Sequence, residues 1–182
     1  MGVAERKRSI RWQVFPRNRS ASEFMRSVIS VFESELGKIG TPDNGLKSNE
    51  VLAVVRPKLE ALEFVVEGSG KVARPVLFGE NDRPTKTYNV DGYHEASGTV
   101  LEVEAGQAVE NNRFAIDLLK AFSIQGANHL VMAIPANYHP ERLKGAGKPP
   151  KKEFDEVVKV LDALFSAGRI QLPLISILII GY

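Results

Sequence analysis

The chain of 182 residues contains no cysteine. This absence excludes disulfides, thiol chemistry and zinc sites with cysteine ligands. The three histidines, His94, His129 and His139, do not have the spacing of zinc ligands, and no G-x-S-x-G nucleophile elbow is present. A metal site in this chain would therefore be built from oxygen ligands.

Long apolar runs are also missing. The longest, LPLISILIIGY at residues 172–182, is about half as long as a membrane-spanning helix. The first residues, MGVAERKRSIRWQ, carry charge but no apolar core of a secretory signal, so we expect a cytoplasmic protein. The composition, 43% hydrophobic and 25% charged, is typical of a soluble globular protein, and the length suits one domain over residues 1–182.

The net charge is only +2, but the basic residues are unevenly distributed. They gather in a basic N-terminal segment, residues 1–19, and in a second stretch at residues 142–152. Such clusters suit contacts with the phosphates of a nucleic acid, although either cluster alone is more typical of a solvated tail or loop. The basic residues concerned are Arg6, Lys7, Arg8, Arg11, Arg17 and Arg19, then Arg142, Lys144, Lys148, Lys151 and Lys152.

Hydrophobic periodicity predicts alternating helices and strands. Apolar residues at three- and four-residue spacing indicate helices at 20–40, from Ser48 to about Leu62 with a kink or early end at Pro57, at 108–127 and at 152–168. Strands are expected at 10–15, 62–68, 74–79, 99–105, 129–134 and 174–180, with a turn at 80–84. This order predicts an α/β protein with a mixed β-sheet core flanked by helices, in which strands 99–105 and 129–134 are joined by a right-handed crossover.

An unusual number of acidic residues lies in VDGYHEASGTVLEVEAG, residues 90–106, which reads as a β-hairpin. Along its second strand Val100, Glu102 and Glu104 should point to one face. If Ser97 and Gly98 form a two-residue turn, Ala96 faces Thr99 and Asp91 lies directly opposite Glu104. Three carboxylates, from Asp91, Glu102 and Glu104, would then share one face of the sheet.

Two interpretations of this hairpin remain open. Like charges opposite one another destabilise a β-ladder, so the cluster suggests a bound cation. The same alternation is typical of any half-exposed strand, and a slip of one residue would send Asp91 to the other face. Polar neighbours in the sequence are Lys86 on the incoming strand and Gln107, Asn111 and Asn112 near the next helix, where asparagines often serve as helix caps.

Asp91, followed after ten residues by Glu102-Val103-Glu104 on a hairpin that leads into a helix and a buried strand, resembles the PD-(D/E)xK nuclease superfamily with its restriction-endonuclease-like fold. The resemblance covers roughly residues 45–182. VLEVEAGQAVENNRFAIDLLKAF followed by HLVMAIP is also similar to an uncharacterised group of bacterial proteins. The resemblance implies that Asp91 and Glu102 bind Mg²⁺. The third position is usually lysine, whereas this chain has Glu104, as some restriction enzymes do. Members of the fold often take a further acid from a preceding helix, for which Glu50 is the candidate.

The resemblance implies a metal-dependent endonuclease that hydrolyses the phosphodiester bonds of DNA. Hard oxygen ligands suit Mg²⁺ or Mn²⁺. Glu104 would be a further ligand or the general base, and Lys86 would stabilise charge at phosphorus. A homodimer would suit the cutting of both strands of a duplex. The alternatives are a catalytically inactive nucleic-acid- or protein-binding module on the same fold, with Lys86 and the acids left on a solvated strand, and another metal- or carboxylate-dependent hydrolase.

Overall fold

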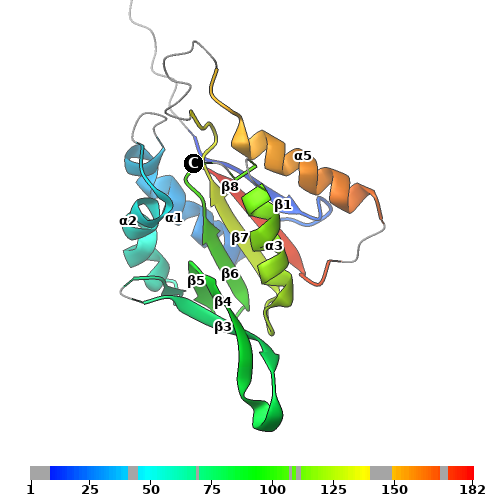
Figure 1. Ribbon diagram of the computed structural model, residues 1–182. Helices are drawn as coiled ribbons and strands as arrows, with labels where there is room; N and C mark the ends of the chain where they lie inside the picture. Colours follow the sequence, from blue (N-terminus) through cyan, green and yellow to red (C-terminus); the bar gives the residue numbers. More distant parts are fainter. Residues whose placement is uncertain are drawn as a thin grey trace, which may run out of the picture.

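The computed structural model describes residues 9–40, 45–68, 70–106, 108–109, 112–139, 149–168 and 172–182. Its described part is a mixed β-sheet of six strands with four helices packed against it (Figure 1). The helices are α1 (Glu23–Ile39), α2 (Ser48–Glu60), α3 (Arg113–Ser123) and α5 (Glu153–Ser166). The sheet strands are β1 (Arg11–Phe15), β2 (Val65–Val66), β5 (Gly92–His94), β6 (Thr99–Val103), β7 (His129–Ile134) and β8 (Ser176–Gly181).

The predicted mixed sheet is confirmed. Its strand order is β1-β8-β7-β6-β5-β2, with β6, β7 and β8 parallel and the outer neighbours antiparallel. Helix α3 connects the parallel strands β6 and β7, where a crossover was expected. Helices cover both faces, so the central strands are almost entirely apolar, and Glu102 in the middle of β6 is an exception that needs a physical reason.

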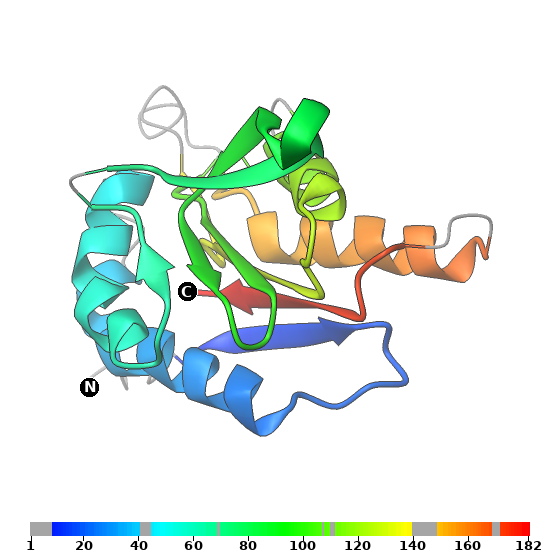
Figure 2. The same cartoon turned by 90° about the horizontal axis from the view of Figure 1, so that it is seen from below.

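The four helices form two layers, with α1 and α2 on one face of the sheet and α3 and α5 on the other (Figures 1 and 2). The alternation of β6 follows this division, as the sequence predicts. Leu101 and Val103 pack in the core beneath α1 and α2, whereas Val100 packs in the core beneath α3 and α5. Glu102 therefore points toward the α3 layer. No helix in the described ranges is long and apolar enough to cross a membrane.

The helix ends follow local chemistry. Helix α1 begins after Ser22, whose hydroxyl accepts a hydrogen bond from the Met25 N–H at 3.2 Å. Helix α2 continues past Pro57 and ends three residues later, at Glu60. Helix α3 begins at Arg113, later than predicted, because Asn112 has a left-handed backbone with φ of 55° that a helix cannot contain.

Two further strands, β3 (Val72–Phe78) and β4 (Pro84–Val90), form a separate two-stranded ribbon that projects from the molecule (Figure 1). The predicted turn between them is present at Glu80–Asp82. The chain leaves the ribbon at Val90 and enters the main sheet at Gly92. Asp91 thus lies at the junction of the two sheets, where the regular pairing of backbone groups is interrupted.

Candidate metal centre

The register of the acidic hairpin differs from the prediction. His94, not Ala96, lies opposite Thr99, and Gly92 lies opposite Leu101, so the pairing is shifted by two residues. The cause is the turn: Glu95–Gly98 form a four-residue connection that ends at Gly98 with φ of +62°. A shift of two keeps every side chain on its predicted face, so Asp91 stays beside β6 but comes level with Glu102 instead of Glu104.

The side chain of Asp91 accepts a hydrogen bond from a backbone N–H of β6 that has no partner on β5. Its Oδ2 accepts the backbone N–H of Val103 at 2.7 Å, at a level of β6 that β5 does not reach. Burial raises the pKa of Asp91 to about 6, while this hydrogen bond acts in the opposite direction. Asp91 is thus held against β6 by one carboxylate oxygen, Oδ2.

Glu102 is the most perturbed acid of the described chain. Only 6% of its surface is exposed, and its Oε1 is buried with no hydrogen-bond partner among the described residues. Burial, followed by the nearby carboxylates of Asp117 and Asp91, raises the pKa of Glu102 to about 9. A buried carboxyl oxygen without a partner costs folding free energy. Such a group calls for a cation or a polar ligand to compensate that cost.

Glu104 lies just after β6 and connects the carboxylates to the edge of the sheet. Its backbone N–H donates to the carbonyl of Ala133 at 2.8 Å, and its own carbonyl accepts a hydrogen bond from the hydroxyl of Tyr182. Arg113 Nη1 lies 3.7 Å from Glu104 Oε2. Burial and the neighbouring Asp117 raise the pKa of Glu104 to about 7, against the opposite effect of Arg113.

Helix α3 adds two residues that the sequence interpretation missed, Asp117 and Lys120. Asp117 is buried, with 5% of its surface exposed, and its Oδ1 accepts a hydrogen bond from Lys120 Nζ at 2.6 Å. Burial acts to lower the pKa of Lys120. The hydrogen bond to Asp117 and the negative charge of Glu102 act in the opposite direction and outweigh burial, so the pKa of Lys120 is above its ordinary value. The signal was present: Asp117 falls on the apolar stripe of α3 between Phe114 and Ala121, where a charged residue is out of place.

The charges of this carboxylate cluster, Asp91, Glu102, Glu104 and Asp117, do not balance. Four carboxylates stand against one ammonium, Lys120, and one guanidinium, Arg113. With all six groups ionised, the cluster and these two cations carry a net charge of −2, which one divalent cation would neutralise. The described residues contain no group of three or more potential ligands already arranged around one point, so binding would require side-chain rotation. Hard oxygen donors of this kind fit Mg²⁺ or Mn²⁺.

Lys86 and Glu50 lie elsewhere. Lys86 is exposed on β4, with Nζ 5.4 Å from the ring centre of Tyr88, and is not among the charges that perturb the cluster. Along an extended strand the five residues from Lys86 to Asp91 span roughly 16 Å. Glu50 caps its own helix, because Oε2 accepts the Lys47 N–H at 2.7 Å. Asn112 precedes α3 without a side-chain cap bond, and Gln107 and Asn111 lie outside the described residues.

The basic segments are described only in part. Arg11 pairs with Asp155 at 2.6 Å and Arg17 pairs with Asp162 at 2.5 Å, so two of the predicted phosphate contacts are engaged with α5. Arg19, Lys151 and Lys152 lie within the described ranges. The remaining basic residues of these segments, Arg6, Lys7, Arg8, Arg142, Lys144 and Lys148, lie outside them.

Comparison with models of known protein families gives no match, and no curated protein matches the sequence. The functional argument therefore depends on the geometry and chemistry of the carboxylate cluster itself.

Proposed function

We propose that the protein is a Mg²⁺- or Mn²⁺-dependent nuclease of the PD-(D/E)xK type that hydrolyses phosphodiester bonds in DNA. The observation that carries the proposal is the buried Oε1 of Glu102, which has no hydrogen-bond partner among the described residues and lies in a cluster of four carboxylates. A structural role does not account for it, since a purely structural core position would be filled more favourably by an apolar residue. The acidic hairpin, the following helix and the parallel strand β7 also support a restriction-endonuclease-like arrangement.

In this proposal Asp91 and Glu102 are the metal ligands. Asp91 keeps one oxygen on the Val103 N–H and offers the other, while Glu102 offers the unpartnered Oε1. Glu104 is a third ligand or the base that takes a proton from the attacking water. A bound divalent cation would polarise the phosphodiester and lower the pKa of that water.

Lys120 is proposed to fill the role that lysine usually has in the (D/E)xK element. Its ammonium reaches the carboxylates from α3, whereas the third position of the element itself is Glu104. There it would orient Glu102 and stabilise negative charge at phosphorus. In this proposal Lys120, and not Lys86, stabilises the charge at phosphorus.

The two lysines can be separated by one pair of variants. Lys120→Met is expected to lower the rate of DNA cleavage by roughly 100-fold, because it removes a positive charge beside the reacting phosphate. Lys86→Met is expected to change the rate by less than about 3-fold, as for an exposed surface residue. Rates are measured on the same oligonucleotide at saturating Mg²⁺. Equal losses in the two variants, or a larger loss in Lys86→Met, would return the role to Lys86.

Metal binding is tested by thermal unfolding with and without divalent cation. At millimolar Mn²⁺ or Mg²⁺ the melting temperature should rise by about 4–10 °C, because a ligand that binds only the folded state stabilises it. Asp91→Ala and Glu102→Ala should abolish this rise, and the exposed-acid control Glu60→Ala should keep it. If both site variants respond to metal as the parent does, the chain is a binding module on this fold. Metal-dependent cleavage of generic phosphoesters, but of neither plasmid nor single-stranded DNA, would indicate a different hydrolase.

A further inference from the structure

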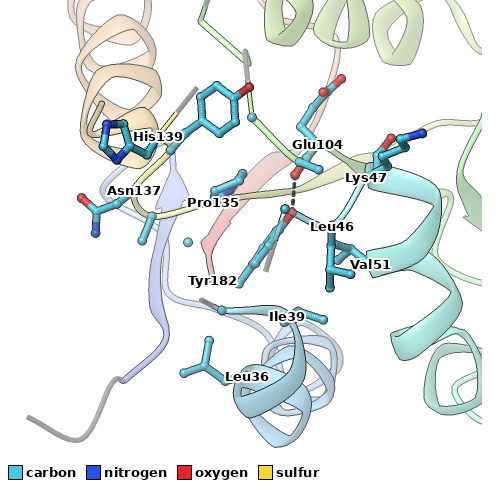
Figure 3. Close-up of a pocket in the computed structure, with 18 of the residues that line it drawn as sticks. Leu36, Ile39, Leu46, Lys47, Val51, Glu104, Pro135, Asn137, His139 and Tyr182 are labelled. Atoms are coloured by element: carbon cyan, nitrogen blue, oxygen red, sulfur yellow. Dashed lines mark hydrogen bonds between the residues drawn. The ribbon is translucent and has the colours of Figure 1, made fainter. Parts of the chain in front are cut away.

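A cavity of about 700 Å³ opens beside Glu104, at the carboxyl ends of the parallel strands (Figure 3). This volume lies within the range of small-molecule sites, roughly 300–1,000 Å³. Glu104 borders both sites: its carbonyl holds the Tyr182 hydroxyl on the cavity side, and its carboxylate belongs to the cluster. The cavity therefore adjoins the carboxylate cluster through Glu104, which belongs to both.

One part of the cavity wall is apolar and aromatic. Leu36, Ile39, Val51 and Tyr182 surround its inner part (Figure 3). Tyr138 forms a second aromatic wall, and its ring lies so close to Gly106 that a β-carbon there would be 2.2 Å from it. Flat aromatic and apolar walls of this kind suit stacking with a nucleobase.

The polar residues of the cavity favour an anion. Arg11, Lys47 and Arg113 contribute three cations, and Glu104 is the only acid among the described residues that line the cavity. Arg11 is partly neutralised by Asp155 at 2.6 Å. Arg113 lines the cavity, and its Nη1 lies 3.7 Å from Glu104 Oε2 of the carboxylate cluster. A ligand with an apolar ring and a phosphate would match both the wall and the charge.

We propose that this cavity binds one unpaired nucleotide next to the scissile phosphate, so that the substrate is single-stranded nucleic acid or a strand with an unpaired nucleotide. The inference rests on the proposed nuclease function and deepens it by naming the form of substrate. A base that enters the cavity and stacks on the partly exposed ring of Tyr138 cannot stay paired with a partner strand. Arg113 then neutralises the phosphate that joins this nucleotide to the one at the carboxylate cluster.

The first test measures binding without catalysis. Deoxynucleoside 5′-monophosphates are titrated calorimetrically into the full chain in excess EDTA, so that the result does not depend on metal. Leu46→Trp, which places a large ring at the half-buried wall, should weaken binding at least ~10-fold. Leu77→Trp, on the exposed ribbon, is the matched control and should bind as the parent does. Arg113→Gln is a second variant, which keeps the test valid if Leu46→Trp does not fold. It preserves the apolar wall and should weaken binding ~10-fold.

The second test compares substrates in the presence of Mg²⁺. A single-stranded oligonucleotide should be cut at least ~10-fold faster than the same sequence in a duplex, and an unpaired nucleotide in the duplex should restore the rate. Mononucleotide binding that is absent, or unchanged in Leu46→Trp and Arg113→Gln, overturns the inference. So does equal cleavage of paired and unpaired substrates, which leaves the nuclease proposal intact. Binding that is lost in the cavity variants while no nucleic acid is cut supports the nucleotide site and refutes the nuclease function.

Discussion

Glu102→Gln is expected to abolish metal-dependent cleavage and, at the same time, to make the metal-free protein more stable. The cleavage rate should fall at least ~100-fold, because the variant loses a charged metal ligand. The free energy of unfolding without metal should rise by about 1–3 kcal/mol at pH 8, because the buried Glu102 carboxyl, with a pKa of about 9, must take up a proton on folding at this pH, whereas the amide is already neutral. A residue that serves only the fold would not show these opposite effects.

Chemical denaturation in EDTA measures the free energy of unfolding, and cleavage of a labelled oligonucleotide at saturating Mn²⁺ measures the cleavage rate. Glu60→Gln is the control, since Glu60 is an exposed acid at the end of α2, and it should change neither. A Glu102→Gln protein that is less stable than the parent at pH 8 would mean that the carboxylate has a stabilising partner. A variant that keeps the parent's cleavage rate would exclude Glu102 as a ligand.

The layers of the fold could be predicted because they depend on local periodicity. Alternation along residues 99–105 assigned Val100 and Glu102 to one face and Leu101 to the other, and both assignments are confirmed. The hairpin register was wrong because it depends on the turn. Sequence did not distinguish a two-residue turn at Ser97 and Gly98 from the four-residue connection that is present. The predicted face of each side chain is still correct, because the register is shifted by two residues and side chains two apart lie on the same face.

The carboxylate cluster was predicted as far as the hairpin reaches and no further. Asp91 and Glu102 are neighbours through strand pairing, which the sequence suggests. Asp117 and Lys120 join them only because α3 packs back over β6, a tertiary contact that no local pattern specifies. Conversely, Lys86 is close to Asp91 in the sequence, but the extended ribbon carries it away. Spacing along the chain predicted which residues are neighbours within the hairpin, but it did not predict which residues of a helix or of the ribbon lie near them.

The stability of the metal-free protein should fall as the pH rises from about 5 to 9. The folded-state pKa values are about 6 for Asp91, about 7 for Glu104 and about 9 for Glu102, all above their ordinary values of 3.8, 4.5 and 4.5. Over this window the folded state holds more protons than the unfolded state, so its stability is fully present at low pH and is lost as the pH rises through these values. At about 1.4 kcal/mol per pKa unit, the loss should amount to several kcal/mol, or at least about 10 °C in melting temperature.

Three other groups with shifted pKa values, Asp155, Asp162 and His129, also affect how stability depends on pH, and their contributions can be separated from that of the carboxylate cluster. Hydrogen bonds from Arg11 and Arg17 lower the pKa values of Asp155 and Asp162. These two acids therefore change the stability of the protein only below about pH 5. Burial lowers the pKa of His129, which makes stability rise with pH up to about 6.5, against the trend. The difference between parent and Glu102→Gln removes both contributions, and it should grow steadily from pH 5 to 9 in EDTA. Saturating Mn²⁺ should flatten the slope of the parent, because the cation takes the place of the bound protons. A difference that stays constant over this range would show that Glu102 is already ionised and paired in the metal-free protein, and the requirement for a cation would disappear with it.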